Sequence, residues 1–155
     1  MREDLKEKIG IYIAYPTSSE FKPIYYKFKT KVNNNHTKVG KCENGFLGRE
    51  KNYQKTFDNE VEFHPIVILN TKEDVQIEKK LIKVLKERYK RVGFAQEWFD
   101  TDDHESVIKI IVDVVKKSGV DYELVWLWKE LIGIPQSCLY ELTFKRFFME
   151  WFDKF

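Results

Sequence analysis

The stretch from Lys38 to Tyr53 reads KVGKCENGFLGREKNY and predicts a strand, a turn and a helix in succession. Thr37 to Cys42 has the composition of a short strand, and Gly45 falls in the turn that follows. The helix is expected from about Phe46 to Thr56, although Gly48 weakens it. Arg49 lies in the early turns of this helix. The rest of the chain is read outward from this unit.

Three further elements surround it. Ile9 to Tyr15 is a β-branched and aromatic strand that the turn residues 16–19 close. Val61 to Leu69 reads as a third strand, and its His64-Pro65 interruption indicates an edge position or a bulge. A helix that Asn70 or Thr71 caps is expected to run to about Arg91 and to end at Gly93. Its apolar positions recur at helical spacing, namely Ile77, Leu81, Ile82, Leu85 and Tyr89.

The remaining segments are less regular. Residues 22–32 predict either an extended hairpin arm or a loop with one strand. Asp102 and Glu105 form a capping box for a helix from about His104 to Lys117. Two more helices are predicted, Tyr122 to Leu131 and Ser137 to Phe155, separated by a Gly-Ile-Pro break.

These elements predict an α+β fold. A small, mainly antiparallel sheet of three or slightly more strands is flanked by helices, with a helical C-terminal extension. The α+β domain is expected to comprise residues 1–100 and the extension residues 101–155. The extension is rich in aromatic residues, which predicts packing on the sheet or, alternatively, self-association as a homodimer.

Composition bounds the class of protein. The 155 residues are 43% hydrophobic and 34% charged, which favours a folded domain over disorder. No apolar run approaches the roughly 20 residues that cross a bilayer, so no membrane association is expected. Cys42 and Cys138 have no metal-ligand spacing. A reducing compartment follows: the cytoplasm for a bacterial, phage or viral protein, or the nucleus in a eukaryotic or viral setting.

Positive charge is concentrated in one segment. Residues 21–56 contain nine Lys or Arg against two Glu, whereas the segments on either side are net negative. Such a segment attracts a polyanion, although a solvated basic surface is an equal alternative. DNA is the expected partner. The candidate contacts are Lys27, Lys29 and Lys31 between the first two strands, and Lys51, Tyr53 and Lys55 on the following helix.

Four side chains supply the chemistry of phosphodiester hydrolysis. The reaction needs an aimed water, a proton acceptor and positive charge on the transition state. Glu78, at the border of its helix's apolar face, is the expected ligand of one Mg²⁺ (or Mn²⁺), an ion that often needs only one or two carboxylates. Arg49 is expected to grip the scissile phosphate. Tyr12 would lie beside the water and Lys38 would add charge, and the nearby cations are expected to favour the Tyr12 phenolate.

The order of these residues resembles the GIY-YIG nuclease domain over residues 8–100. That family begins with a Gly-Ile-Tyr strand, matched by Gly10-Ile11-Tyr12. A second strand ends in Gly, an Arg follows on the next helix, and a Glu lies on a later helix. The resemblance implies a metal-dependent DNA endonuclease, with Tyr12 as base, Arg49 as helper and Glu78 as metal ligand.

The second motif departs from the family's usual form. Lys38-Val39-Gly40 has Lys in place of the leading Tyr, as in a branch that includes restriction enzymes. That branch implies a catalytic helper at Lys41. Gln96 to Phe99 resembles a segment of a phage-associated branch, so a restriction, phage or mobile-element setting is implied. Tyr12 and Lys38 are 26 residues apart, more than is typical, which predicts a DNA-contacting arm in the insertion.

Alternatives remain at the weaker positions. His36 is close enough in sequence to Lys38 to line the same pocket, whereas His64 and His104 are read as structural. The acids around Asp102 are read as a helix cap and not as a metal site. Two other functions compete with cleavage: a non-catalytic DNA-binding module on the same fold, and a protein-interaction domain.

Overall fold

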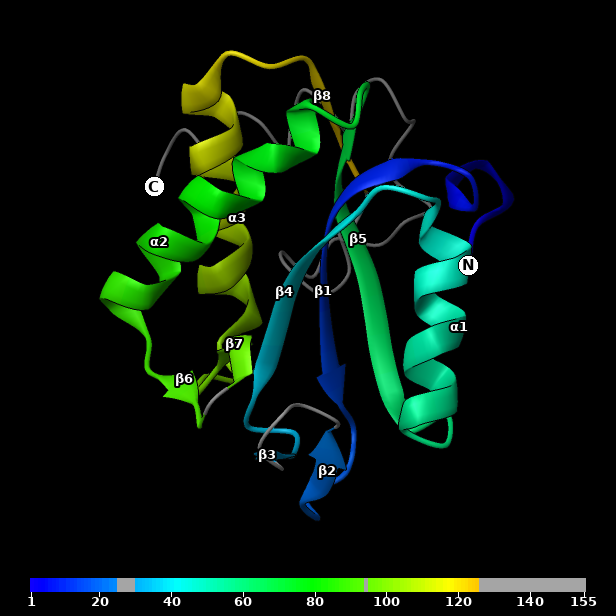
Figure 1. Ribbon diagram of the computed structural model, residues 1–155, viewed down its shortest axis with the longest axis vertical. Helices are drawn as coiled ribbons and strands as arrows, with labels where there is room; N and C mark the ends of the chain where they lie inside the picture. Colours follow the sequence, from blue (N-terminus) through cyan, green and yellow to red (C-terminus); the bar gives the residue numbers. More distant parts are fainter. Residues whose placement is uncertain (25–29, 94, 126–155) are drawn as a thin grey trace, which may run out of the picture.

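The computed structural model describes residues 1–24, 30–93 and 95–125, and they form an α+β fold (Figure 1). The strands are β1 (Ile9–Pro16), β2 (Lys22–Ile24), β3 (Thr30–Val32), β4 (Thr37–Cys42), β5 (Val61–Leu69), β6 (Arg91–Val92), β7 (Ala95–Phe99) and β8 (Tyr122–Leu124). The α-helices are α1 (Phe46–Thr56), α2 (Glu78–Arg88) and α3 (His104–Ser118), with short 3-10 turns at Glu3–Leu5 and Asp74–Ile77.

A six-stranded sheet in the order β6-β7-β4-β1-β5-β8 organises the fold, and β2 and β3 pair separately. Every strand pair is antiparallel. The predicted strands at 9–15, 37–42 and 61–69 are confirmed as β1, β4 and β5. The sheet is larger than predicted because β6, β7 and β8 were not assigned as strands; β6 and β8, two and three residues long, are too short to show an alternating pattern.

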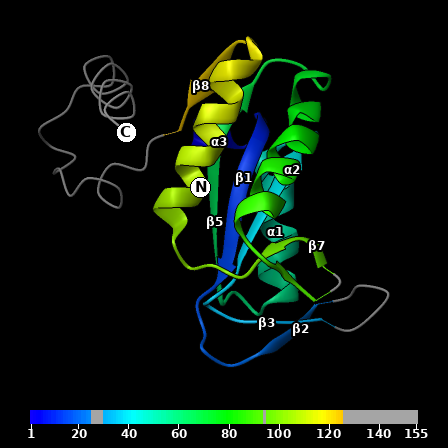
Figure 2. The same ribbon diagram turned by 90° about the vertical axis from the view of Figure 1, so that its left-hand side faces the viewer.

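Alternation along β1 divides the interior between two faces of the sheet. Ile11 and Ile13 belong to a core cluster that includes residues of α2 and α3. Tyr12 and Ala14 belong to a second cluster, with Phe46 of α1. Side chains at successive strand positions point to opposite faces. Figures 1 and 2 accordingly show α2 and α3 on one side of the sheet and α1 on the other.

Gly10 explains the first residue of the Gly-Ile-Tyr motif. Its φ is +153°, and a Cβ added there would lie 1.8 Å from the carbonyl oxygen of Val67 on β5. No other amino acid fits so close to a neighbouring backbone. Gly10 therefore allows β1 and β5 to pair tightly just before Tyr12.

The interruption in β5 is a bulge. Ile11 pairs with Val67 while Tyr12 pairs with Pro65, so the register shifts by one residue on β5. The strand is not an edge along its whole length, because β8 pairs with Val67–Leu69. Within the described ranges, the half of β5 that contains Pro65 pairs only with β1, so its other side is an edge. An edge accommodates proline, which has no backbone N–H to donate.

The helix predicted from residues 70–71 to 91 is shorter and begins differently. The Thr71 hydroxyl accepts a hydrogen bond from the Asp74 N–H at 3.1 Å, and a 3-10 turn precedes α2. Helix α2 starts at Glu78 and ends at Arg88, where the next residue, Tyr89, is extended. Gly93 does not end the helix: it lies between β6 and β7 with φ +55°, in the turn of a hairpin that was not predicted.

Helix α3 is confirmed, with a different cap. Asp103, not Asp102, accepts a hydrogen bond from the Ser106 N–H at 3.1 Å. Its apolar side joins the core cluster beneath α2 through Val107, Ile111 and Val115. The helix ends at Gly119 in the left-handed conformation.

The C-terminal predictions meet the structure only in part. The helix expected at residues 122–131 is wrong at its start, because Tyr122–Leu124 forms β8 on the edge of β5. The helix expected at residues 137–155 lies outside the described residues, as does most of the aromatic extension. For residues 22–32 the hairpin alternative holds, with β2 and β3 paired and residues 25–29 outside the description. In the described ranges no helix is long and apolar enough to span a bilayer.

Candidate active site

The Tyr12 hydroxyl is placed by a glycine opposite it and by a second tyrosine above it. Tyr12 pairs with Gly40 of β4, where a Cβ would lie 2.5 Å from the Tyr12 hydroxyl oxygen. The ring therefore occupies the space that a side chain at Gly40 would need. The hydroxyl is hydrogen-bonded to the Tyr53 hydroxyl of α1 at 2.9 Å. Tyr12 is only 2% exposed, whereas Tyr53 is half-buried and forms the outer member of the pair.

Lys38 is a buried cation with an acidic partner. It lies at the start of β4 and is 5% exposed. Its ammonium forms an ion pair with the Glu97 carboxylate of β7, and the backbones of Lys38 and Trp98 pair in the same sheet. Burial of a lysine is costly unless a partner compensates the charge. The hairpin β6–β7 thus holds the Lys38 ammonium in place.

Glu78 is the buried carboxylate of the site. It is the first residue of α2 and is 6% exposed. Burial, and then the negative charge of Glu97, raise its pKa above the usual glutamate value. The charges of Lys41 and Lys38 and a hydrogen bond from the Lys41 backbone N–H act in the opposite direction and do not cancel the effect. The anionic form of Glu78 is therefore destabilised in its own site.

Arg49 lies on the outer edge of the same group. It is exposed on α1, one helical turn before Tyr53, so both side chains leave the same side of the helix. Partial burial lowers the pKa of the guanidinium, but the neighbouring Tyr12 and Tyr53 hydroxyls and Cys42 raise it overall. Arg49 is thus close to both phenols while its face remains open to solvent.

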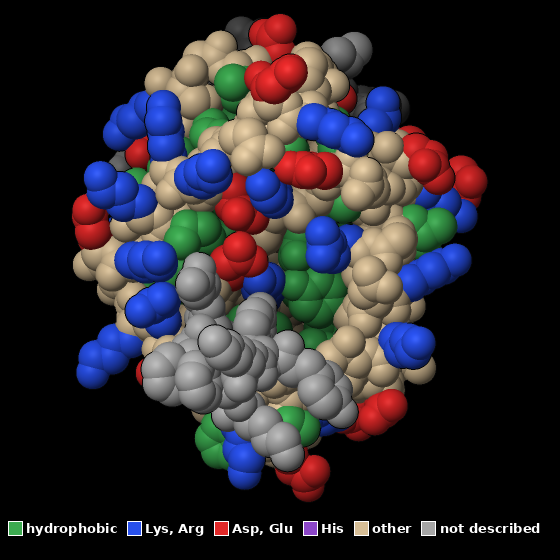
Figure 3. Space-filling view, viewed as in Figure 1, with side chains coloured by type: hydrophobic (Ala, Val, Ile, Leu, Met, Phe, Trp, Pro, Cys, Tyr) green, Lys and Arg blue, Asp and Glu red, His purple; other side chains and the backbone are tan. Residues whose placement is uncertain are grey.

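The structure brings these residues close to one another. Arg49, Glu97 and Glu78 all affect the pKa of Tyr12, and Glu97, Lys41 and Lys38 all affect that of Glu78. Figure 3 shows a hollow between α1 and α2 with an apolar floor and with acidic and basic side chains around it. Tyr12 and Glu78, sixty-six residues apart in the sequence, thus lie close enough for the charge of Glu78 to act on the Tyr12 hydroxyl.

The expectation of a Tyr12 phenolate is wrong for the protein without substrate. Burial raises the pKa of Tyr12 above the ordinary value of 10.0. The hydrogen bond with Tyr53 and the charge of Arg49 lower it, but burial outweighs them. Tyr12 is therefore a neutral phenol at neutral pH, and its hydroxyl both donates and accepts hydrogen bonds.

Lys41 contributes its backbone more directly than its side chain. Its ammonium donates to the Gln76 Oε1 at 3.1 Å and lies 3.3 Å from the Glu43 carboxylate. Gln76 in turn donates to Glu43 at 2.8 Å, which closes a small surface network. The predicted helper is thus occupied by this network, while its N–H bonds to Glu78 and its charge reaches that carboxylate.

His36 is occupied by a turn. Its Nδ1 accepts a hydrogen bond from the Asn33 N–H at 3.0 Å, and its Nε2 lies 3.6 Å from the Asp100 carboxylate. Burial lowers the pKa of His36 and Asp100 acts against this. These described partners of His36 stabilise the entry to β4, and the site residues are not among them.

The predicted DNA contacts are dispersed. Lys31 is exposed on β3, and Lys51 and Lys55 are exposed on α1. Lys27 and Lys29 lie outside the described residues. Tyr53, predicted as a DNA contact, lies against Tyr12 inside the site. The sequence signal for this placement was present, because Tyr53 follows Arg49 by four residues on a helix.

Glu97 is the site residue that sequence reasoning missed. Its segment, Gln96 to Phe99, was noted for its aromatic residues, but the acid itself received no role. A charged residue immediately before Trp98 and Phe99, both buried, is the signal that would have identified it.

The acids present fit a cation that needs few protein ligands. The described residues contain no group of three His, Cys, Asp or Glu that would enclose a metal ion. Mg²⁺ does not require one, because it keeps several waters and takes one or two carboxylates. Glu78 meets this need: burial and Glu97 disfavour its charge, and a bound cation would relieve both effects. The site therefore fits one Mg²⁺ or Mn²⁺ beside Glu78.

Comparisons with known proteins add no further information. A scan against models of known families, a search of curated proteins and a search of solved structures each found no match to this chain.

Proposed function

We propose that this protein is a metal-dependent endonuclease that hydrolyses phosphodiester bonds of DNA. The observation that carries the proposal is that Tyr12, Lys38, Arg49 and Glu78 lie close enough for their charges to act on one another. A buried acid with a raised pKa, two cations and a phenol are the groups that phosphoryl hydrolysis requires. The resemblance of their order to the GIY-YIG nucleases supports the same reaction.

Arg49 and Lys38 supply positive charge from two sides. The exposed Arg49 guanidinium is suited to grip the scissile phosphate through paired hydrogen bonds. Lys38 is held by Glu97, so its ammonium is positioned before the substrate arrives. Such preorganised charge stabilises the additional negative charge of the transition state without reorganisation.

The tyrosine pair orients the water and transfers its proton. As the water attacks phosphorus, its proton passes to the Tyr12 oxygen while the Tyr12 proton passes to Tyr53. Tyr53, the outer member, releases its own proton to solvent. This relay leaves both residues neutral, so it does not require the free phenolate that burial disfavours.

Glu78 would hold one Mg²⁺ or Mn²⁺, with the Lys41 N–H fixing the carboxylate. When bound, such an ion stabilises the negative charge of the departing oxygen. Ionisation of Glu78 is a condition for this role. Burial raises the pKa of Glu78. As the pH is lowered, activity is therefore expected to fall at a higher pH than it would with an ordinary glutamate.

The test is plasmid nicking by the purified full chain with Mg²⁺ or Mn²⁺. Glu78→Gln and Arg49→Ala are expected to lower the nicking rate by at least about 100-fold, as loss of one preorganised charge in such a site does. Glu20→Gln, at an exposed loop acid, is the matched control and should retain full activity. Nicking that survives Glu78→Gln would reject the proposal.

A non-catalytic DNA-binding module is the second candidate, and the burial of Tyr12 favours it. A neutral phenol that is 2% exposed has little access to a water. This candidate predicts that the wild type binds duplex DNA with no nicking under any divalent metal. Any metal-dependent nicking that Arg49→Ala abolishes decides against it.

A further inference from the structure

Helix α2 carries a strongly basic surface that the nuclease site does not use. Residues 79–91 contain seven Lys or Arg against one acid, Glu87. Lys79, Lys80, Lys83 and Lys86 are exposed, and none of them forms an ion pair with another described residue. Figure 3 shows Lys and Arg side chains gathered over α2, beside the hollow. These cations lie outside the basic segment at residues 21–56.

Helical spacing places three of these lysines on one side. Positions 79, 83 and 86 follow one another at intervals of four and three residues, so they line up along the helix. We name Lys79, Lys83 and Lys86 the lysine stripe. The stripe begins one residue after Glu78 and leads away from the candidate active site. The core-facing positions Leu81 and Leu85 separate it from the side of α2 that faces α3.

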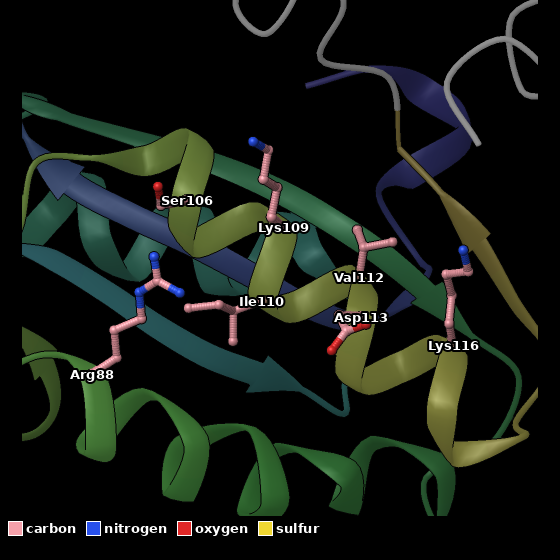
Figure 4. Close-up of a pocket in the computed structure, with 7 residues that line it drawn as sticks. All are labelled: Arg88, Ser106, Lys109, Ile110, Val112, Asp113 and Lys116. Atoms are coloured by element: carbon pink, nitrogen blue, oxygen red, sulfur yellow. The ribbon is translucent and has the colours of Figure 1, made fainter. Parts of the chain in front are cut away.

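The opposite side of α2 offers a natural comparison. A cleft of about 440 Å³ lies between α2 and α3, where Figure 4 shows Arg88, Lys109 and Lys116. On the helical wheel Arg88 lies roughly 160–180° from Lys79 and Lys86, because nine and two residues correspond to about 900° and 200° of turn. The cleft therefore has the same number of cations as the stripe but faces away from it, and it also contains Asp113.

We propose that the lysine stripe binds the phosphate backbone of the DNA duplex that flanks the scissile bond. The inference rests on the proposed nuclease function and adds the direction in which the duplex leaves the site. From Lys79 to Lys86 the helix rises about 10 Å at 1.5 Å per residue. One strand of duplex DNA places a phosphate every 3.4 Å along its axis, so the stripe spans about three phosphates.

Charge complementarity is the physical reason. Lysines such as these, which form no ion pair with another described residue, release condensed counterions from DNA when they contact phosphates. Each contact steepens the salt dependence of binding. The stripe reads no base, so it contributes affinity and register and leaves sequence preference to other residues.

The experiment measures binding of a short labelled duplex in EDTA, over a series of salt concentrations. The stripe variant combines Lys79→Gln, Lys83→Gln and Lys86→Gln. The matched control combines Arg88→Gln, Lys109→Gln and Lys116→Gln, which removes the same formal charge. The stripe variant should reduce the slope of log K against log salt by about 2–3 and weaken binding by about tenfold or more. The control should change the slope by less than about 1.

Equal effects of the two triple variants would overturn the proposal, because net charge alone would then explain the binding. A triple Lys→Arg variant of the stripe keeps the charge and should bind like the wild type; if it binds like the Gln variant, the proposal fails. Circular dichroism of each variant confirms that α2 is intact.

The two proposals fail in different ways. Stripe-dependent binding by a protein that never nicks DNA would reject the nuclease and keep the stripe. Nicking of plasmid by a protein whose binding ignores the stripe would keep the nuclease and reject the stripe.

Discussion

Gly40 shows how one missing side chain creates the site. The Tyr12 hydroxyl lies where a Cβ at residue 40 would be, at 2.5 Å, so the Gly of the second motif and the Tyr of the first are one steric unit. Their pairing across β1 and β4 makes each dependent on the other. A glycine at this position is thus explained by packing, before any catalytic role is considered.

Gly40→Ala is expected to displace the Tyr12 ring and break its hydrogen bond with Tyr53. Overpacking of this kind destabilises a fold by about 1–3 kcal/mol, and nicking should fall sharply with it. The control is Gly48→Ala on α1, where an added Cβ meets nothing within 4 Å. That change should stabilise the helix by about 0.5–1 kcal/mol. Urea denaturation measures both; equal effects in the two variants would contradict the steric explanation.

Glu78→Gln is expected to stabilise the protein at neutral pH and to lose that advantage in acid. Burial raises the pKa of Glu78 in the folded state, so its ionisation costs stability as pH rises through that pKa. Below the usual glutamate value of 4.5, both folded and unfolded wild type are protonated and the cost disappears. Denaturation from pH 4 to pH 8 should therefore show a growing gap between the variant and the wild type. If the difference in free energy of unfolding between the variant and the wild type instead shrinks as pH rises, the prediction is contradicted.

At the scale of elements, β7 is attached to β4 by a charge pair within the sheet. Lys38 is buried and Glu97 is its partner across the strands, so removal of either takes away the charge that compensates the other most directly. The exposed pair Lys117–Asp113, 3.0 Å apart within α3, has no such constraint because water screens it.

A double-mutant cycle with Lys38→Met and Glu97→Gln should give a coupling free energy of about 1–3 kcal/mol. The same cycle with Lys117→Met and Asp113→Asn should give less than about 0.5 kcal/mol. Urea denaturation provides the four free energies of unfolding in each cycle. Similar coupling in both cycles would show that burial of Lys38 does not strengthen the pair.

Elements with their own hydrophobic period were predictable, and elements defined by their neighbours were not. β1, β4, β5 and α3 have clear patterns and appear as predicted. β8 is three residues long and exists because the edge of β5 offers hydrogen-bond partners, so tertiary pairing overrides the helical signal there. β6 was read as the end of a helix because the pattern alone does not show where Tyr89 becomes extended, and the β7 segment was noted for its aromatic residues without being assigned to a strand.

At the scale of the whole molecule, residue types were predictable and their states were not. The order of Tyr12, Arg49 and Glu78 in the sequence was enough to expect them together. The pKa values of Tyr12 and Glu78 depend on burial and on Glu97, which no local pattern reports. The phenolate expected at Tyr12 is wrong for this reason: the sequence shows the nearby cations but not the desolvation that outweighs them.

Binding of Mn²⁺ should stabilise the folded molecule through Glu78 alone. A ligand that binds only the native state at ten times its Kd adds about 1.4 kcal/mol, which raises the Tm of a chain of this size by about 3–6 °C. The wild type should show this Tm shift at pH 8. The shift should disappear as acid protonates Glu78, and because the pKa of Glu78 is raised, it should disappear at a higher pH than for an exposed glutamate ligand. Glu78→Gln should show no shift at any pH, while Glu20→Gln should shift like the wild type. Because the measurement uses no DNA, a Mn²⁺ shift that persists in Glu78→Gln would place the ion elsewhere, whether or not the protein cuts.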